Sequence, residues 1–178
     1  GWFSAFTPEH TFDPSGLVKT WAANAAAQHL LAQGIVDFTM NAGGDVWISN
    51  GATEAADWKI GISKPVTIAL GDPGLVTVVD LAGTEYNSMA TSGSAERGDH
   101  IWNPKASDKS SPKELVQVSV IARDLVTADV WATAAFAEGT RAIADLNKVV
   151  GIEAIFILPD GELAATDGFV ALLASGEN

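Results

Sequence analysis

The hydrophobic pattern changes its period along this chain, from one long helical stretch to a series of short extended runs. Residues 16–33 are rich in alanine, follow the helix-start signal Asp13-Pro14-Ser15 and end before Gly34, a typical C-terminal cap. Two more helices are predicted at 127–137 and 140–148, divided by Gly139. Strands are predicted at 35–40, 46–49, 58–62, 75–81, 116–122, 154–158 and 162–165. Hairpins mixed with a few long helices indicate an α+β fold.

Glycine-containing pairs separate several of these strands. Asn50-Gly51 is a strong hairpin signal, and Asp160-Gly161 predicts a second tight turn. Residues 83–98 are rich in Ser, Thr and Gly and contain few bulky apolar side chains, which is typical of a loop. Residues 103–114 have the composition of a polar connector.

Composition limits the classes of partner. A chain of 178 residues suits a single domain, and its formal net charge of −12, with no cluster of Lys and Arg, argues against binding to nucleic acid. The absence of cysteine excludes disulfides and thiolate metal sites. No apolar run approaches the roughly 18 residues of a transmembrane segment. A phosphate-bearing ligand would need a cation or well-aimed backbone amides to overcome the acidity.

The segment 128–134 places a carboxylate and a hydroxyl one helical turn apart. Asp129 and Thr133 are spaced i, i+4, so they share a helix face, and together they form a plausible half-site for a hard divalent cation such as Mg²⁺. Two structural interpretations remain open. Thr133 could satisfy its hydroxyl on an upstream carbonyl, and Asp129 could answer the helix dipole from the first turn.

Further candidates lie on turns and loops. Gly43-Gly44 could turn backbone N–H groups toward an anion or form an ordinary turn, and the following Asp45 could bind a ribose hydroxyl or an amide. Lys19 opposes the dipole of the first helix, which hints at a functional use.

Two loop segments carry groups suited to phosphate chemistry. Thr91 and Ser92 offer hydroxyls that could hold phosphate oxygens, although a solvated turn has the same composition. His100 could remove a proton from an attacking hydroxyl, or it could be a half-buried strand histidine.

Taken in order, these segments resemble the ApbE family of flavin transferases. The resemblance covers about residues 13–137, and several motifs in one order are more specific than any single motif. Departures from the usual family pattern occur at Thr20, where glycine is usual, at Asn24, where an acidic residue is usual, and at Asn103, where aspartate is usual. The matching motifs are Asp13-Pro14-Ser15-Gly16-Leu17-Val18-Lys19, residues 41–45, residues 90–93, Glu96-Arg97, residues 100–104 and residues 128–134.

The resemblance implies a T-fold-like α+β architecture, in which a mostly antiparallel sheet packs against helices. It implies Mg²⁺-dependent transfer of FMN from FAD to a threonine hydroxyl of an acceptor protein, with release of AMP. A FAD-binding protein, a Mg²⁺-dependent FAD pyrophosphatase and a catalytically impaired scaffold remain alternatives. In this scheme Asp129 and Thr133, with a backbone carbonyl near Val18, bind Mg²⁺, and His100 is the catalytic base. The residues implied to line the FAD site are Lys19, Asn41, Asp45, Thr91 and Ser92.

The resemblance also bears on domain organisation. It implies a single ApbE-like domain over residues 1–178 that lacks the family's N-terminal portion. Three interpretations of this stay open: a second chain completes the flavin site, the sequence is a truncated piece, or flavin handling is impaired. Family members are often extracytoplasmic and membrane-anchored, while others are cytoplasmic, so the compartment stays open.

Overall fold

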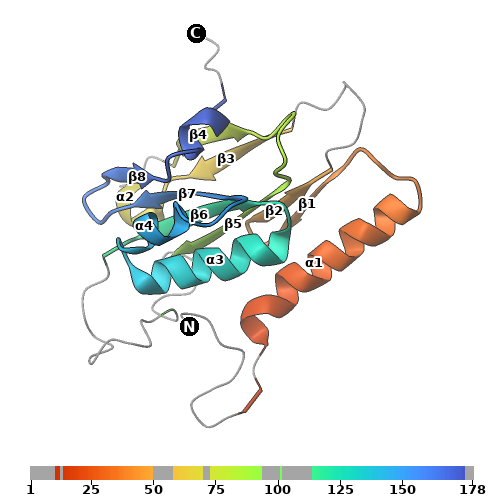
Figure 1. Cartoon of the computed structure of the whole chain (residues 1–178), viewed down its shortest axis with the longest axis horizontal. Coiled ribbons are helices and arrows are strands. Elements are labelled where there is room, and N and C mark those ends of the chain that lie inside the picture. The colour runs from red at the N-terminus through yellow and green to blue at the C-terminus, as the bar shows by residue number, and fades with distance from the viewer. Residues whose placement is uncertain are drawn as a thin grey trace.

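An antiparallel sheet of six strands forms the centre of the fold, in the order β1-β2-β5-β6-β7-β8 (Figure 1). The computed structural model of the chain describes residues 11–12, 14–49, 58–69, 73–93, 101 and 114–174. The sheet strands are β1 (Thr39–Ala42), β2 (Asp45–Ile48), β5 (Ser88–Gly93), β6 (Gln117–Ala122), β7 (Ile152–Ile157) and β8 (Leu163–Ala165).

Helices cover one face of this sheet (Figure 1). Helix α3 (Leu125–Glu138) packs on the central strands β5 and β6, while α1 (Ser15–Ala32) packs against α3, β1 and β2. The short helix α4 (Ala142–Leu146) packs on β7. Many of the buried side chains of this layer are alanines, which let α3 approach the sheet closely.

A two-stranded antiparallel sheet covers the opposite face. It consists of β3 (Lys59–Ser63) and β4 (Leu75–Asp80), and its inward-facing side chains meet Met89, Ile121 and Ile155 of the large sheet. The remaining elements are the short helix α2 (Val66–Ala69) and the 3-10 turn η1 (Phe169–Leu172). Two apolar layers therefore hold the central sheet from both sides.

The α+β class and the mostly antiparallel sheet are confirmed. The first helix lies within one residue of its predicted bounds, and Gly34 after it has a φ of 81°. The strand predicted at 35–40 is wrong over residues 35–38, because β1 begins at Thr39 and runs to Ala42. Ile35 and Val36 are exposed and lead from α1 into the sheet, so their apolar character does not reflect a buried strand.

Two further predictions are wrong, for reasons of tertiary packing. Within residues 83–98, β5 is a central strand rather than a loop, and its small side chains fit beneath the alanine-rich face of α3. The strands on either side of Asn50-Gly51 do not form a hairpin: β2 pairs with β1 and β5 at its two edges, and β3 pairs with β4. Residues 50 and 51 themselves lie outside the described part of the chain.

Candidate active site

Asp124 fixes the start of α3 and thereby the direction in which the helix presents its side chains. Its carboxylate oxygens accept hydrogen bonds from the Thr127 backbone N–H at 2.8 Å and from the Thr127 hydroxyl at 2.6 Å. This is a side-chain N-cap, and it places the stabilising negative charge at the helix N-terminus. Asp129 lies four residues beyond the first helical residue, so Asp124 occupies the dipole-compensating position suggested for Asp129.

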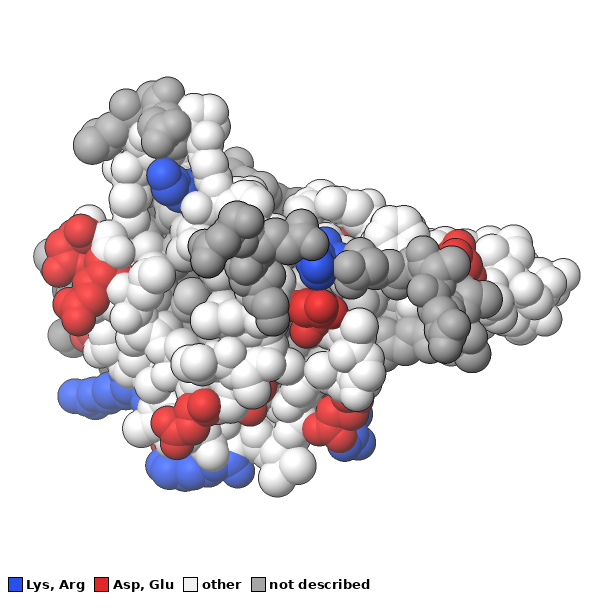
Figure 2. All heavy atoms as spheres, turned by 90° about the horizontal axis from the view of Figure 1, so that it is seen from above, with Lys and Arg blue, Asp and Glu red and all other residues white. Residues whose placement is uncertain are grey.

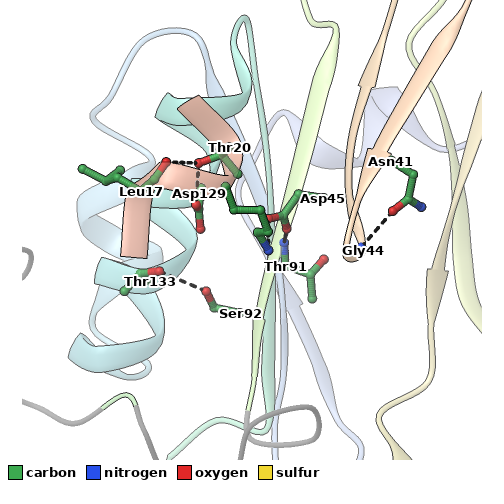
Figure 3. A network of polar contacts seen from close by, with 10 residues as sticks. Leu17, Thr20, Asn41, Gly44, Asp45, Thr91, Ser92, Asp129 and Thr133 are labelled. Carbon is green, nitrogen blue, oxygen red and sulfur yellow. Dashed lines mark hydrogen bonds and ion pairs between the residues drawn. The ribbon is translucent and has the colours of Figure 1, made fainter. Parts of the chain in front are cut away.

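Asp129 lies at the contact between α3 and α1. The residue is 9% exposed, and its Oδ2 accepts a hydrogen bond of 2.7 Å from the hydroxyl of Thr20 (Figure 3). Thr20 is completely buried, and its hydroxyl also lies 3.2 Å from the Leu17 carbonyl oxygen. A buried carboxylate is therefore held by a hydroxyl from a neighbouring helix.

Thr133 contacts the sheet one helical turn further along α3. Its hydroxyl lies 3.2 Å from the hydroxyl of Ser92 on β5, and either oxygen can donate (Figure 3). The i, i+4 spacing does place Asp129 and Thr133 in one helix. Their oxygens thus belong to one polar strip between α1, α3 and β5.

Lys19 forms the second half of the site with Asp45. The Lys19 Nζ lies 2.7 Å from Asp45 Oδ2, with the lysine side chain 37% exposed and the aspartate side chain 3% exposed. Asp45 Oδ1 accepts a hydrogen bond of 3.1 Å from the Thr91 backbone N–H (Figure 3). This carboxylate explains why a cation is tolerated near the positive end of the α1 dipole.

The paired glycines form the tight turn between β1 and β2. Gly43 and Gly44 have φ values of 62° and 94°, which favour glycine, and the Gly44 N–H donates to the Asn41 side-chain oxygen at 2.9 Å. A side chain at position 43 would also meet Lys19, whose Cδ would lie 3.7 Å from the added Cβ. The turn therefore lies beside the lysine, and the Gly44 amide is used within the turn itself.

These contacts close a ring across four elements. Two consecutive residues of α1, Lys19 and Thr20, reach β2 and α3 respectively. Two consecutive residues of β5 also reach these two elements. The Thr91 backbone N–H donates to Asp45 of β2, and the Ser92 hydroxyl contacts Thr133 of α3. Segments far apart in the sequence thus assemble one continuous polar site.

The structure separates the Thr91 and Ser92 side chains, which were expected to line one surface together. Side chains alternate along a strand, so Ser92 faces α3 while the Thr91 hydroxyl points to the other face, 2.8 Å from the Ser119 hydroxyl. Only the backbone amide of Thr91 joins the ring.

Three predicted site residues are not placed in the ring: His100, Val18 and Asn41, whose side-chain oxygen accepts from the Gly44 N–H within the turn. His100 lies outside the described residues, as do Glu96-Arg97 and residues 102–104. The Val18 side chain is 48% exposed, and the α1 carbonyl that approaches the Asp129 site through Thr20 is that of Leu17. The sequence predicted a backbone carbonyl near Val18 as a metal ligand, and the carbonyl that contacts Thr20 belongs to the preceding residue, Leu17.

Sequence reasoning missed the contribution of Thr20. The helical period places it with Ala23 and Ala27 on the buried stripe of α1, and all three are buried. A polar side chain on an otherwise apolar buried stripe must find a hydrogen-bond partner inside the protein. That signal was readable from the sequence, although the identity of the partner was not.

Among the described residues, the site offers carboxylate and hydroxyl oxygens as possible metal ligands, and it contains no cluster of acidic and imidazole groups. Within the described ranges, no three His, Cys, Asp or Glu side chains are grouped so that they could hold a metal ion. One carboxylate with neighbouring hydroxyls suits a hard cation that keeps water and phosphate among its ligands. On the face shown in Figure 2, the described Lys and Arg side chains lie apart from one another, with Asp and Glu between them.

None of the helices in the described ranges combines the length and the apolar character that crossing a bilayer requires.

Comparison with known proteins identifies relatives of this chain. The model of the ApbE family matches residues 4–156. A FAD:protein FMN transferase of Klebsiella pneumoniae (strain 342) is 27% identical over 165 residues, covering 88% of this chain and 48% of the relative. A FAD:protein FMN transferase of Vibrio cholerae is 26% identical over 153 residues, covering 80% and 44%. The chain thus spans about half the length of the curated relatives it matches.

Solved structures of ApbE proteins have a fold similar to that of this chain. The flavin transferase ApbE from Vibrio cholerae has a TM-score of 0.76 and 25% identity, and the match covers 93% of this chain and 54% of that one. The ApbE protein of Thermotoga maritima has a TM-score of 0.75 and 25% identity, with coverage of 96% and 59%. Because the family model matches most of the chain and the fold agrees, this chain belongs to the ApbE family.

Proposed function

We propose that this chain carries the catalytic centre of a Mg²⁺-dependent FAD:protein FMN transferase. The observation that carries the proposal is the polar ring, which brings Asp129 and Thr133 together with the Lys19–Asp45 pair beside the Gly43-Gly44 turn. The names printed for the curated relatives support flavin transfer as the reaction class.

Charge balance supports a cation at this site. The diphosphate of FAD is anionic, while the chain has a net charge of −12 and Lys19 is already paired with Asp45. Asp129 adds a further carboxylate. Attack at phosphorus depends chiefly on positioning and cationic stabilisation, so these residues alone leave the diphosphate poorly neutralised.

The donor set fits Mg²⁺ because its atoms are all oxygens on a few protein ligands. We propose that Asp129 and Thr133, with a backbone carbonyl near Val18, hold the ion, which when bound screens the diphosphate charge. Lys19, Asn41, Asp45, Thr91 and Ser92 are proposed to line the FAD site. Asp45 pairs with Lys19 and accepts from the Thr91 backbone N–H, so we propose that Asp45 and Thr91 orient Lys19 relative to β5.

The proposed reaction transfers a phosphoryl-linked group to an alcohol. The hydroxyl oxygen of an acceptor threonine forms a bond to the FMN phosphorus of FAD, and the bond to the AMP oxygen breaks. AMP leaves, and the hydroxyl proton passes to His100 acting as general base. The acceptor is therefore proposed to be a protein that presents an accessible threonine.

Mass spectrometry tests this proposal directly. The chain is incubated with FAD, Mg²⁺ and a threonine-containing acceptor peptide, and we expect a covalent FMN adduct together with AMP. The Asp129→Ala variant should form no adduct. The matched control Asp145→Ala removes an exposed aspartate that pairs with Lys148 on the surface, and it should behave like the parent chain.

The outcomes separate the alternatives. Free FMN with AMP and no adduct would indicate a FAD pyrophosphatase instead. Unchanged FAD would contradict the proposal and favour a binding protein or scaffold. Equal turnover by the Asp129→Ala variant and the parent chain would refute the metal role of Asp129.

A further inference from the structure

Thr20 links α1 directly to Asp129 of α3 within the ring. Its hydroxyl lies 2.7 Å from Asp129 Oδ2 and 3.2 Å from the Leu17 carbonyl oxygen. Both Thr20 and Asp129 are buried, so water contributes little to orienting the carboxylate. We propose that Thr20 is a positioning residue that makes the Asp129 site select Mg²⁺ over Ca²⁺, an inference that rests on the proposed metal role of Asp129.

The two distances show how the hydroxyl acts. A threonine hydroxyl has one proton, and the shorter contact gives that proton to Asp129. The Leu17 carbonyl, three residues earlier in α1, lies where a helical threonine commonly forms a hydrogen bond. Because this contact is the longer of the two, the proton stays on the Asp129 side and the hydroxyl restrains the carboxylate.

The orientation of the carboxylate matters differently to the two ions. The terminal torsion of an aspartate side chain is broad, so an unrestrained carboxylate can turn between several binding modes. Ca²⁺ accepts six to eight ligands in flexible geometry, with carboxylates bound through one or two oxygens. Mg²⁺ demands near-ideal octahedral geometry. A hydrogen bond that restrains Asp129 should therefore favour Mg²⁺ more than Ca²⁺.

The test measures ion binding alone, without FAD or turnover. Mg²⁺ and Ca²⁺ are titrated separately into the parent chain and its variants by isothermal calorimetry. Thr20→Val keeps the shape of the side chain and removes the hydroxyl. It should weaken Mg²⁺ binding about 10- to 100-fold, the loss typical when a metal ligand loses its hydrogen-bond partner. Its Ca²⁺ affinity should change by about threefold or less. Thr20→Ser retains the hydroxyl and should keep a preference close to the parent value.

A matched control separates selectivity from general packing. Thr166 is also buried and also donates its hydroxyl to a carboxylate, that of Glu153, at the β7 end of the sheet. Thr166→Val therefore removes a hydroxyl–carboxylate hydrogen bond away from the ring, together with the acceptor of the Ala154 N–H. It should lower the thermal stability without changing the affinity for either ion. Circular dichroism verifies that each variant is folded before titration.

The result distinguishes this inference from the proposed function. If Thr20→Val binds both ions as the parent does, or loses both to the same extent, Thr20 does not set selectivity, even where Asp129→Ala abolishes binding. If the parent chain does not bind Mg²⁺, or Asp129→Ala binds it unchanged, the metal site itself is refuted and this inference with it.

Discussion

Lys19 and Asp45 should contribute unequally to stability, although they form one ion pair. The Asp45 side chain is 3% exposed and that of Lys19 is 37% exposed. Lys19→Met removes the charge and keeps the stem beside the Gly43 turn, but it leaves a buried carboxylate whose partner among the described residues is the Thr91 amide. Asp45→Asn instead leaves a lysine that can reach water, and the new side-chain oxygen can still accept from Thr91.

The magnitude follows from the separation and the burial. At 2.7 Å the attraction of two unit charges is about 6 kcal/mol for an effective dielectric constant of about 20, before desolvation and entropy are subtracted. Breaking a fully buried pair costs roughly 3–5 kcal/mol, and an exposed pair contributes about 0–1 kcal/mol. With one partner exposed, we expect about 2 kcal/mol for Lys19→Met and about 1 kcal/mol for Asp45→Asn.

The assay is a double-mutant cycle by urea unfolding, followed by far-ultraviolet circular dichroism. The double variant contains no buried charge at this position, so its cost should be about 1 kcal/mol, which gives a coupling of about 2 kcal/mol. Lys148→Met is the matched control, because Lys148 pairs with Asp145 while 72% exposed, and it should cost less than about 0.5 kcal/mol. A larger cost for Asp45→Asn than for Lys19→Met, or simple additivity, would refute this reasoning.

Three other outcomes follow from particular residues. His100→Ala should slow FMN transfer more than it weakens FAD binding, as transfer kinetics and FAD titration would show, because a base acts on the barrier; equal losses would reassign it to binding. Asp124→Ala should destabilise the protein by about 1 kcal/mol in thermal unfolding, since the Thr127 N–H loses its cap; an unchanged melting temperature would contradict this. The Thr140 backbone N–H and hydroxyl donate to Glu114 and lower its pKa from 4.5, so its contribution is present above pH 4.5 and lost as the pH falls below that value. Glu114→Gln should flatten this acid dependence in unfolding curves recorded from pH 6 to pH 3, and an identical slope would argue against it.

Local signals in the sequence were sufficient for α1, α3 and α4 and for the class of the fold, while α2 was not predicted. The alanine-rich stretch before Gly34 predicts α1 to within a residue, and Gly139 marks the end of α3. These features depend on neighbouring residues: the helical period, a capping residue, and a glycine that can adopt a positive φ. The i, i+4 spacing likewise places Asp129 and Thr133 in one helix.

Strand β5 could not be predicted in the same way. Its Ser, Thr, Ala and Gly residues are typical of a loop, and they form a central strand because α3 packs closely above it and leaves room only for small side chains. The Asn50-Gly51 signal failed for a related reason, since both edges of β2 are occupied by other strands. Strand pairing depends on partners distant in the sequence, and turn propensity does not reveal them.

The chemical groups of this protein can be read from its residues alone: a carboxylate and a hydroxyl one helical turn apart, a lysine opposed to its helix dipole, and paired glycines in a turn. How these groups meet depends on the packing of the folded chain. It brought Thr20 to Asp129 across 109 positions of sequence and turned Thr91 and Ser92 to opposite faces of β5. Residue type sets what a side chain can donate or accept, while helix packing and sheet register, fixed by burial of apolar surface, set which partner it reaches.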